Sequence, residues 1–335
     1  MGFVPLVEEY RGEALENVHY GAISVVDENG KVLYAAGDPH HQTFLRSAAK
    51  PFQAIPVLKR RVDELYGLSG KETALFAASH RGETFHIEAL ESILRKTGIV
   101  EENLYCGPAY PLNEAARAER LRAHESKRRI FHNCSGKHSG LIALCKHMGW
   151  DEETYYMPDH PLQKEIVATL AAIAEVPESS ISLGVDGCGL PIFAIPLDKI
   201  AYAYMKLACP DRIEDAEIAA AAEKMARLMN EYPDMIADTR FVCSALLKDP
   251  NLTAKGGAKG VYGIGLRRER IGISLKVSDG SEQVWPCIIG SILERLGYAN
   301  QATIDRLYEV VPNEIYNDGG TLVGYRRPVY KWNAK

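Results

Sequence analysis

The chain has 335 residues, of which 46% are hydrophobic and 25% are charged. These values are typical of soluble globular proteins and exclude disordered, collagen-like and low-complexity architectures. The length predicts one large domain or two intimate ones. With 39 basic and 44 acidic residues, the net charge is −5, so no basic field is present to attract nucleic acid or acidic lipid.

Neither export nor membrane insertion is indicated. The longest apolar stretches, such as 166–176, are much shorter than the roughly 20 residues that span a bilayer. The first residues have neither the basic region nor the apolar region of a secretory signal. Seven cysteines, an odd number, indicate thiols or metal ligands rather than a disulfide framework. We therefore expect a cytoplasmic enzyme-sized protein that binds no nucleic acid and no membrane.

Alternating β-branched residues over 21–37, interrupted by Asp-Glu-Asn-Gly at 27–30, predict a β-hairpin with its turn at Asn29-Gly30. The middle of the chain has helical periodicity and residues of high helix propensity. It predicts helices at 86–95, 113–123, 162–174 and 213–230.

A second hairpin is predicted near the C-terminus, from 260–266 and 271–277, followed by a helix over 281–296 that ends at Gly297. The simplest packing joins the two hairpins into one antiparallel sheet covered by helices. We predict an α+β fold, with a sheet lobe at about 1–55 and 235–335 and an inserted helical lobe at about 56–234.

Phosphate-binding loops, an HExxH motif and the Gly-x-Ser-x-Gly elbow are all absent from the sequence. Ser47 and Lys50 instead form a Ser-x-x-Lys pattern. At this spacing a desolvated lysine amine can accept the serine proton, which makes the hydroxyl a nucleophile. Pro51 disfavours α geometry at Lys50, so we expect Ser47 in a tight, 3₁₀-like turn before the helix. The alternative is a chance pattern.

Two further polar segments accompany it. Ser79 and His80 lie in Ala78-Ser-His-Arg-Gly-Glu83, where a capped helix C-terminus is the alternative interpretation. Lys255-Gly-Gly257, just before the second hairpin, resembles the Lys-[Thr/Ser]-Gly strand of penicillin-binding proteins and serine β-lactamases. Those enzymes also have Ser-x-x-Lys early in the chain and the second lysine late.

Cys134 and Cys188 each lie among small residues, in 131–140 and 184–191. Two thiolates, completed by Lys137 or His138, could bind zinc. Two buried free thiols are the alternative, because paired Cys-x-x-Cys motifs are absent.

Five motifs in order along the chain resemble the Rhizobium-etli-type L-asparaginases, which differ from the threonine-dependent asparaginases. They are Arg46-Ser-Ala-Ala-Lys-Pro51, Ala78-Ser-His-Arg-Gly-Glu83, His132-Asn-Cys-Ser-Gly-Lys-His138, Gly184-Val-Asp-Gly-Cys-Gly189 and Lys255-Gly-Gly-Ala-Lys-Gly260. The resemblance implies a fold of the serine β-lactamase/glutaminase type and cleavage of L-asparagine to L-aspartate and ammonia. Lys259 departs from the family pattern, where a glutamate is expected.

The resemblance also implies the roles of individual residues and a homodimeric assembly. The catalytic groups are two serine–lysine tandems, Ser47 with Lys50 and Ser79 with Lys255. One zinc ion is held by Cys134, Lys137 and Cys188, and the substrate is bound by Arg46, His138 and Asp186.

Other functions are left open by the sequence. A glutaminase or another β-lactamase-like serine acylase would use the same residues. A zinc hydrolase would attack with metal-bound hydroxide instead. A metal-stabilised interaction protein would use the serines only structurally. Ser79 in place of Ser47 is the alternative nucleophile.

Overall fold

The computed structural model describes residues 2–334, and the chain divides into two compact units. Residues 1–48, 195–208 and 240–335 form what we call the sheet unit, and residues 49–194 and 209–239 form the helical unit. Residues 195–208, which lie within the predicted helical lobe, belong to the sheet unit.

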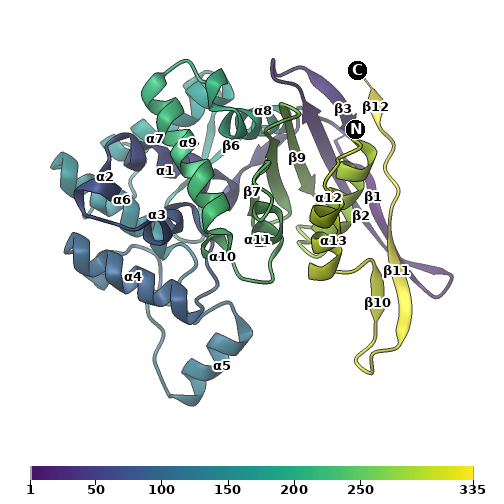
Figure 1. Ribbon diagram of the computed structural model, residues 1–335, viewed down its shortest axis with the longest axis horizontal. Coiled ribbons are helices and arrows are strands. Elements are labelled where there is room, and N and C mark those ends of the chain that lie inside the picture. The colour runs from purple at the N-terminus through teal and green to yellow at the C-terminus, as the bar shows by residue number, and fades with distance from the viewer. Residues whose placement is uncertain (1, 335) are drawn as a thin grey trace. The chain divides into compact units, whose positions relative to one another are not determined.

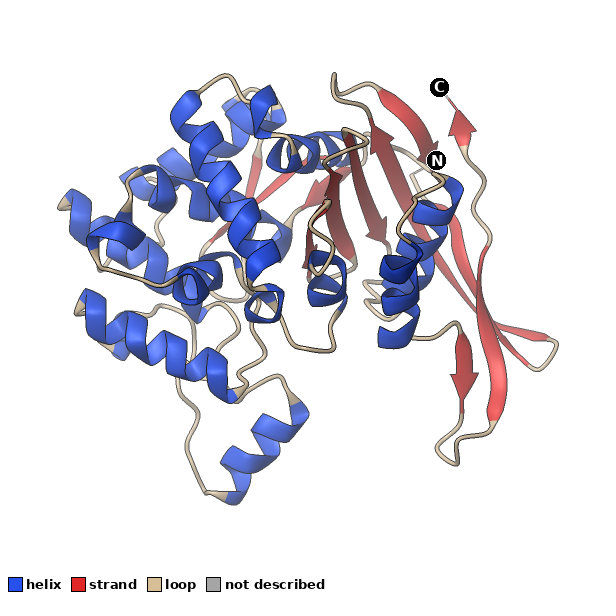
Figure 2. Cartoon of the chain, viewed as in Figure 1, coloured by secondary structure: helices blue, strands red, loops and turns tan. Residues whose placement is uncertain are grey.

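The sheet unit is built on a nine-stranded antiparallel sheet, with the strand path β10-β11-β1-β2-β9-β8-β7 (Figures 1 and 2). Off this path, β3 pairs with β2, and β12 pairs with β3. The two predicted hairpins are β2–β3 and β8–β9, and pairing of β2 with β9 joins them as expected. The mixed α/β class with an antiparallel sheet is confirmed. The strands of this unit are β1 (Val4–Arg11), β2 (Ala14–Val26), β3 (Val32–Ala36), β4 (Gln42–Phe44), β7 (Leu252–Gly257), β8 (Val261–Leu266), β9 (Ile271–Val277), β10 (Glu314–Tyr316), β11 (Leu322–Pro328) and β12 (Asn333–Ala334).

Helix α8 (Leu197–Ala208) covers one face of this sheet because glycines leave room for it. A Cβ atom on Gly263 would lie 2.2 Å from the Tyr204 ring, and one on Gly272 would lie 2.0 Å from the Ala201 carbonyl oxygen. The opposite face contacts α12, where the rings of Tyr262 and Trp285 pack edge to face. The edge strand β7 and its neighbour β8 are buried throughout. The other helices here are α11 (Val242–Leu247), α12 (Trp285–Arg295) and α13 (Gln301–Val310).

In the helical unit, α1 packs against α6, α7 and α9. Its residues are buried over nearly the whole helix. The helices are α1 (Lys50–Lys59), α2 (Val62–Leu65), α3 (Gly70–Ala74), α4 (Thr84–Thr97), α5 (Glu114–Arg122), α6 (Ser135–Met148), α7 (Pro161–Ala174), α9 (Ala216–Glu231) and α10 (Pro233–Ile236). The remaining strands are β5 (Ser182–Val185) and β6 (Pro191–Pro196). The described residues also form the 3₁₀ turns η1 (Arg46–Ala49), η2 (Leu75–Ala77), η3 (Glu101–Asn103), η4 (Glu178–Ser180) and η5 (Pro210–Arg212).

The predicted helices are α4, α5, α7, α9 and, in the sheet unit, α12. Helix α9 begins three residues later than predicted, because the Asp215 carboxylate caps it by accepting the N–H groups of Glu217 and Ile218. Gly297, with φ of 67°, follows α12 as expected. Among residues 2–334, no helix is both long enough and apolar enough to cross a membrane.

Candidate functional site

Lys50 is the first residue of α1, and η1 precedes it directly, which confirms the tight turn predicted before Pro51. The lysine side chain is fully buried. Its Nζ atom lies 2.6 Å from the Ala78 carbonyl oxygen, 3.1 Å from the Asn133 carbonyl oxygen and 3.0 Å from Ser79 Oγ. The structure therefore brings the lysine of the Ser-x-x-Lys motif to the second predicted serine.

These three contacts divide into two kinds. The carbonyl oxygens of Ala78 and Asn133 can only accept hydrogen bonds, so they hold two N–H groups of the lysine. The third direction from Nζ points to Ser79 Oγ, which can both donate and accept. A neutral amine held in this way directs its lone pair at the serine hydroxyl. The arrangement suits proton transfer between Ser79 and Lys50.

Ser79 follows η2 in an extended segment that is pinned by backbone hydrogen bonds. Its N–H donates to the Ile236 carbonyl oxygen at 2.8 Å, and the Arg81 N–H donates to the Ala237 carbonyl oxygen at 3.0 Å. The interpretation of Ser79 as the helix cap is wrong, because Ala78 is the C-terminal cap of η2. The chain after it pairs with Ile236, the last residue of α10, and with Ala237.

Ser47 lies in η1, and the sheet unit holds this turn from two directions. The Ala48 N–H donates to the Leu45 carbonyl oxygen at 3.0 Å, and the Tyr204 hydroxyl donates to the Ala48 carbonyl oxygen at 2.7 Å. Beneath the turn, a Cβ atom on Gly257 would lie 2.3 Å from the Leu45 carbonyl oxygen. The second glycine of the Lys-Gly-Gly segment thus allows the Ser47 turn to approach β7.

Lys255 lies on β7, two residues before Gly257, so both share a face of the strand. Lys255 is opposite Gly263 in the ladder, on the face covered by Tyr204 of α8. The Lys255 side chain is buried, and its Nζ donates to the Gly256 carbonyl oxygen at 2.7 Å. Lys255 and the Ser47 turn therefore lie on the same side of the sheet. The implied pairings of Ser47 with Lys50 and of Ser79 with Lys255 join residues of the two units and stay predictions.

The second candidate centre is a buried group that we call the thiol cluster, formed by Cys134, Lys137, His138 and Cys188. The first three lie at the start of α6, and Cys188 lies in the loop between β5 and β6. Lys137 Nζ donates to Cys188 Sγ at 3.3 Å. The glycines of the Ser-Gly-Lys-His-Ser-Gly segment allow α6 to pack closely. A Cβ atom at the first of them, Gly136, would lie 2.4 Å from the Leu75 carbonyl oxygen.

The pKa values of the two thiols are shifted in opposite directions. A hydrogen bond from Cys188 holds the pKa of Cys134 well below its usual value, against the effect of burial, and the positive charges of Lys50 and Lys137 lower it further. Donating that bond raises the pKa of Cys188, as does burial. Burial by itself would lower the pKa of Lys137, but the negative charge on the sulfurs and on Asp186 raises it. These shifts favour a negative charge on Cys134 and a positive charge on Lys137.

The donor set of the thiol cluster fits zinc. Two sulfurs and an amine nitrogen are ligand types that zinc accepts, once the lysine and the second thiol lose their protons. Within residues 2–334, no group of three or more histidine, cysteine or acidic residues is arranged to hold a metal ion. The resemblance implies Lys137 as the third protein ligand of zinc, beside Cys134 and Cys188.

The three predicted substrate-binding residues have different surroundings. Asp186 begins the turn that carries Cys188, and its Oδ1 accepts the N–H of Gly187 at 2.8 Å. Arg46 lies in η1 beside Ser47, with φ of 50°. His138 is fully buried, and its Nδ1 lies 2.5 Å from the Tyr155 hydroxyl oxygen. Sequence reasoning missed Tyr155, because nothing in its local pattern distinguishes it from other tyrosines of the chain.

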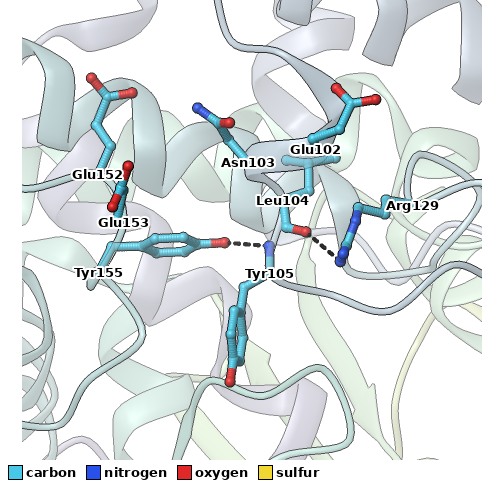
Figure 3. A pocket seen from close by; sticks show the side chains of 8 residues that line it. All are labelled: Glu102, Asn103, Leu104, Tyr105, Arg129, Glu152, Glu153 and Tyr155. Carbon is cyan, nitrogen blue, oxygen red and sulfur yellow. Dashed lines mark hydrogen bonds between the residues drawn. The ribbon is translucent and has the colours of Figure 1, made fainter.

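Tyr155 also borders a cavity of about 210 Å³ in the helical unit (Figure 3). Its hydroxyl accepts the Tyr105 backbone N–H at 2.9 Å, and Arg129 donates to the Leu104 carbonyl oxygen at 2.9 Å. The cavity is lined by Glu102, Asn103, Leu104, Tyr105, Arg129, Glu152, Glu153 and Tyr155. The tyrosine thus connects this cavity to the thiol cluster.

Comparison with models of known protein families identifies one family that matches this chain. The model of the family described as L-asparaginase II matches residues 7–328. No curated protein matches the chain. Among solved structures, a β-lactamase from Mycobacterium bovis is 13% identical, with 82% of this chain and 94% of that chain covered, at a TM-score of 0.41.

Two further solved structures give similar values. A β-lactamase from Sphaerobacter thermophilus is 12% identical, with 83% and 92% covered, at a TM-score of 0.42. Native Mglu is 18% identical, with 82% of this chain and 64% of that chain covered, at a TM-score of 0.38.

Proposed function

Because this chain belongs to the L-asparaginase II family, we propose that it hydrolyses the side-chain amide of L-asparagine to L-aspartate and ammonia. Family membership makes the chain a hydrolase that acts on amides, of the asparaginase type. The substrate, the serine–lysine chemistry and the zinc site are the proposal. The main support for the proposal is the contact of the buried Lys50 Nζ with Ser79 Oγ, while two carbonyl oxygens hold the same Nζ.

In the proposed reaction, Ser47 Oγ attacks the side-chain carbonyl carbon of asparagine, and its proton passes to the lysine–serine system. The amide nitrogen takes a proton and leaves as ammonia. The aspartyl ester on the serine is then hydrolysed by water, which returns the proton to the serine. Lys50 is the base, and Ser79 passes protons between Lys50 and the reacting groups. Lys255 acts with Ser79 from the sheet unit.

The thiol cluster would hold zinc through Cys134, Lys137 and Cys188, and the bound metal would supply a Lewis acid beside the substrate. Arg46, His138 and Asp186 would bind and orient the charged groups of the amino acid. Asp186 offers a carboxylate to the substrate ammonium, while Arg46 offers a guanidinium to its carboxylate. These roles follow from the chemistry of each side chain.

A second assignment of the nucleophile is favoured by one observation. Ser79 is the serine that contacts Lys50, at 3.0 Å, so Ser79 itself could be activated for attack. The overall reaction would be the same, with Ser47 in the relay.

The deciding experiment measures ammonia release from L-asparagine by the wild type, Ser47→Ala and Ser79→Ala. Acyl-enzyme formation is followed by mass spectrometry after rapid acid quenching. We expect Ser47→Ala to lose at least a factor of about 10³ in kcat and to form no acyl-enzyme. Ser79→Ala should be slow but still acylated at Ser47. Acylation of Ser79 in the Ser47→Ala variant would overturn the assignment.

The same assay with L-glutamine and a chromogenic β-lactam tests the substrate. We expect L-asparagine to have the highest kcat/KM. A higher value for either competitor would replace the proposed activity by that of a glutaminase or another serine acylase.

A further inference from the structure

Tyr155 and His138 form a hydrogen-bonded pair, and the proposed reaction gives no role to Tyr155. Tyr155 Oη lies 2.9 Å from the Tyr105 backbone nitrogen and 2.5 Å from His138 Nδ1. Both side chains are at most 1% exposed. Within residues 2–334, the Tyr155 hydroxyl has no hydrogen-bond partner besides these two.

The hydrogens of this pair follow from counting donors. A backbone N–H can only donate, so the Tyr155 oxygen accepts from Tyr105. Burial raises the pKa of Tyr155 far above its usual value, so the phenol keeps its proton. In the part of the chain that the structure describes, the one acceptor within reach of that proton is His138 Nδ1. A neutral imidazole that accepts at Nδ1 carries its own hydrogen at Nε2.

The Tyr105 side chain keeps the Tyr105 backbone N–H in place. The Tyr105 ring stacks on the Tyr156 ring, with 3.6 Å between the ring centroids. The ring also packs against Gly189, where a Cβ atom would lie 2.4 Å from it. Gly189 follows Cys188, so Tyr105 contacts the Cys188 loop while its N–H binds Tyr155. The positions of Tyr155 and of the loop are therefore coupled through one residue.

His138 Nε2 is buried and has no hydrogen bond of good geometry among the described residues. Cys188 interacts with the His138 ring, and Nε2 is the ring nitrogen that the bond to Tyr155 leaves available. An Nε2 atom that carries hydrogen cannot donate a lone pair to a metal, but it can donate a hydrogen bond to sulfur. Hydrogen-bond donors to metal-bound sulfur commonly tune such sites.

From these contacts we propose that Tyr155 is a positioning residue that sets the tautomer of His138. In this tautomer Nε2–H faces Cys188, so the imidazole donates a hydrogen bond to the Cys188 sulfur. The imidazole is then neither a metal ligand nor a base toward the cysteines. The proposed zinc site then keeps its fourth position open. The predicted tautomer does not depend on the proposed function, whereas the open fourth position of the zinc site does.

The primary test uses metal-free protein labelled with ¹⁵N-histidine, in which long-range ¹H–¹⁵N spectra identify the protonated ring nitrogen. In the wild type, we expect His138 to be protonated at Nε2 and unprotonated at Nδ1. Tyr155→Phe removes one oxygen atom and should give a mixture with the Nδ1–H form. Tyr156→Phe is the matched control and should leave the wild-type tautomer unchanged.

The metal readout is the absorption spectrum of the cobalt(II)-substituted protein. In Tyr155→Phe the Nε2 lone pair becomes available, so the ligand-field bands should shift, whereas in Tyr156→Phe they should not. An Nδ1–H tautomer in the wild type, or an unchanged tautomer in Tyr155→Phe, overturns the proposal. If the tautomer is as expected but the protein releases no ammonia from L-asparagine, the proposed function fails and the inference stands.

Discussion

Two buried lysines of the helical unit, Lys50 and Lys137, differ in their surroundings. Lys50 is held by two carbonyl oxygens and a serine hydroxyl, which carry no charge. Lys137 lies 3.3 Å from Cys188 Sγ, in a cluster where the sulfurs and Asp186 raise its pKa. The comparison shows that identical side chains at helix starts acquire different chemistry from their neighbours. Lys50 is arranged for proton transfer with a serine hydroxyl, and Lys137 is stabilised as a cation.

Replacing the first lysine should have the largest effect. We expect Lys50→Met to lower kcat for L-asparagine by about 10²- to 10⁴-fold, because the proposed base is lost. The control is Lys206→Met, which removes a lysine that is also buried but lies over the Tyr202 ring of the sheet unit. It should retain most activity. Equal losses in the two folded variants would mean that Lys50 is only structural.

Replacing a sulfur of the thiol cluster should remove the metal instead. We expect about one zinc ion per chain in the wild type and a zinc affinity at least about 100-fold lower in Cys134→Ser and Cys188→Ser. Metal analysis after dialysis measures this directly. Cys145→Ser and Cys209→Ser are controls, since these buried thiols lie outside the cluster. If both cluster variants keep their zinc, the site lies elsewhere.

A smaller effect should separate the two ends of the His138 ring. The amide nitrogen of glutamine can replace Nε2–H, whereas the shorter asparagine reaches only the Nδ1 position. We therefore expect kcat/KM of His138→Gln to exceed that of His138→Asn by about tenfold. Zinc content and thermal unfolding of both variants are measured alongside. The reverse order would contradict a donor role for Nε2.

The last prediction concerns the pH dependence of stability rather than activity. It uses His86, a buried base that stays neutral, in contrast to the cationic Lys137. Burial lowers the pKa of His86 to about 4, although its hydrogen bond to the Asp234 carbonyl oxygen opposes this. Below about pH 6.5 the unfolded chain takes up a proton that the folded chain does not bind, so stability falls between about pH 6.5 and pH 4.

We expect His86→Gln to lose about 2 kcal/mol less stability than the wild type between pH 7 and pH 4.5. Urea unfolding at the two pH values measures the difference. His147→Gln, which changes a histidine at the end of α6, is the control and should follow the wild type. The same slope in His86→Gln and the wild type would show that His86 does not remain neutral.

Much of the secondary structure was predictable, because it depends on neighbours in the chain. The Asn29-Gly30 turn and the glycine after α12 need a positive φ, and both have it. Helix α8 was not predicted, and its placement depends on glycines of β8 and β9 that lie about 60 residues later. Strands β1 and β11 were also missed, since their pairing joins the two ends of the chain.

For the candidate site, the sequence alone determined the candidate residues and the order in which they occur, because five short motifs can be recognised without any structure. It also determined the tight turn at Ser47, since Pro51 acts on its immediate neighbour. Only the tertiary structure decided that Lys50 contacts Ser79 and that Tyr155 contacts His138. These partners are 29 and 17 residues apart, and hydrogen bonds over such separations depend on how whole elements pack.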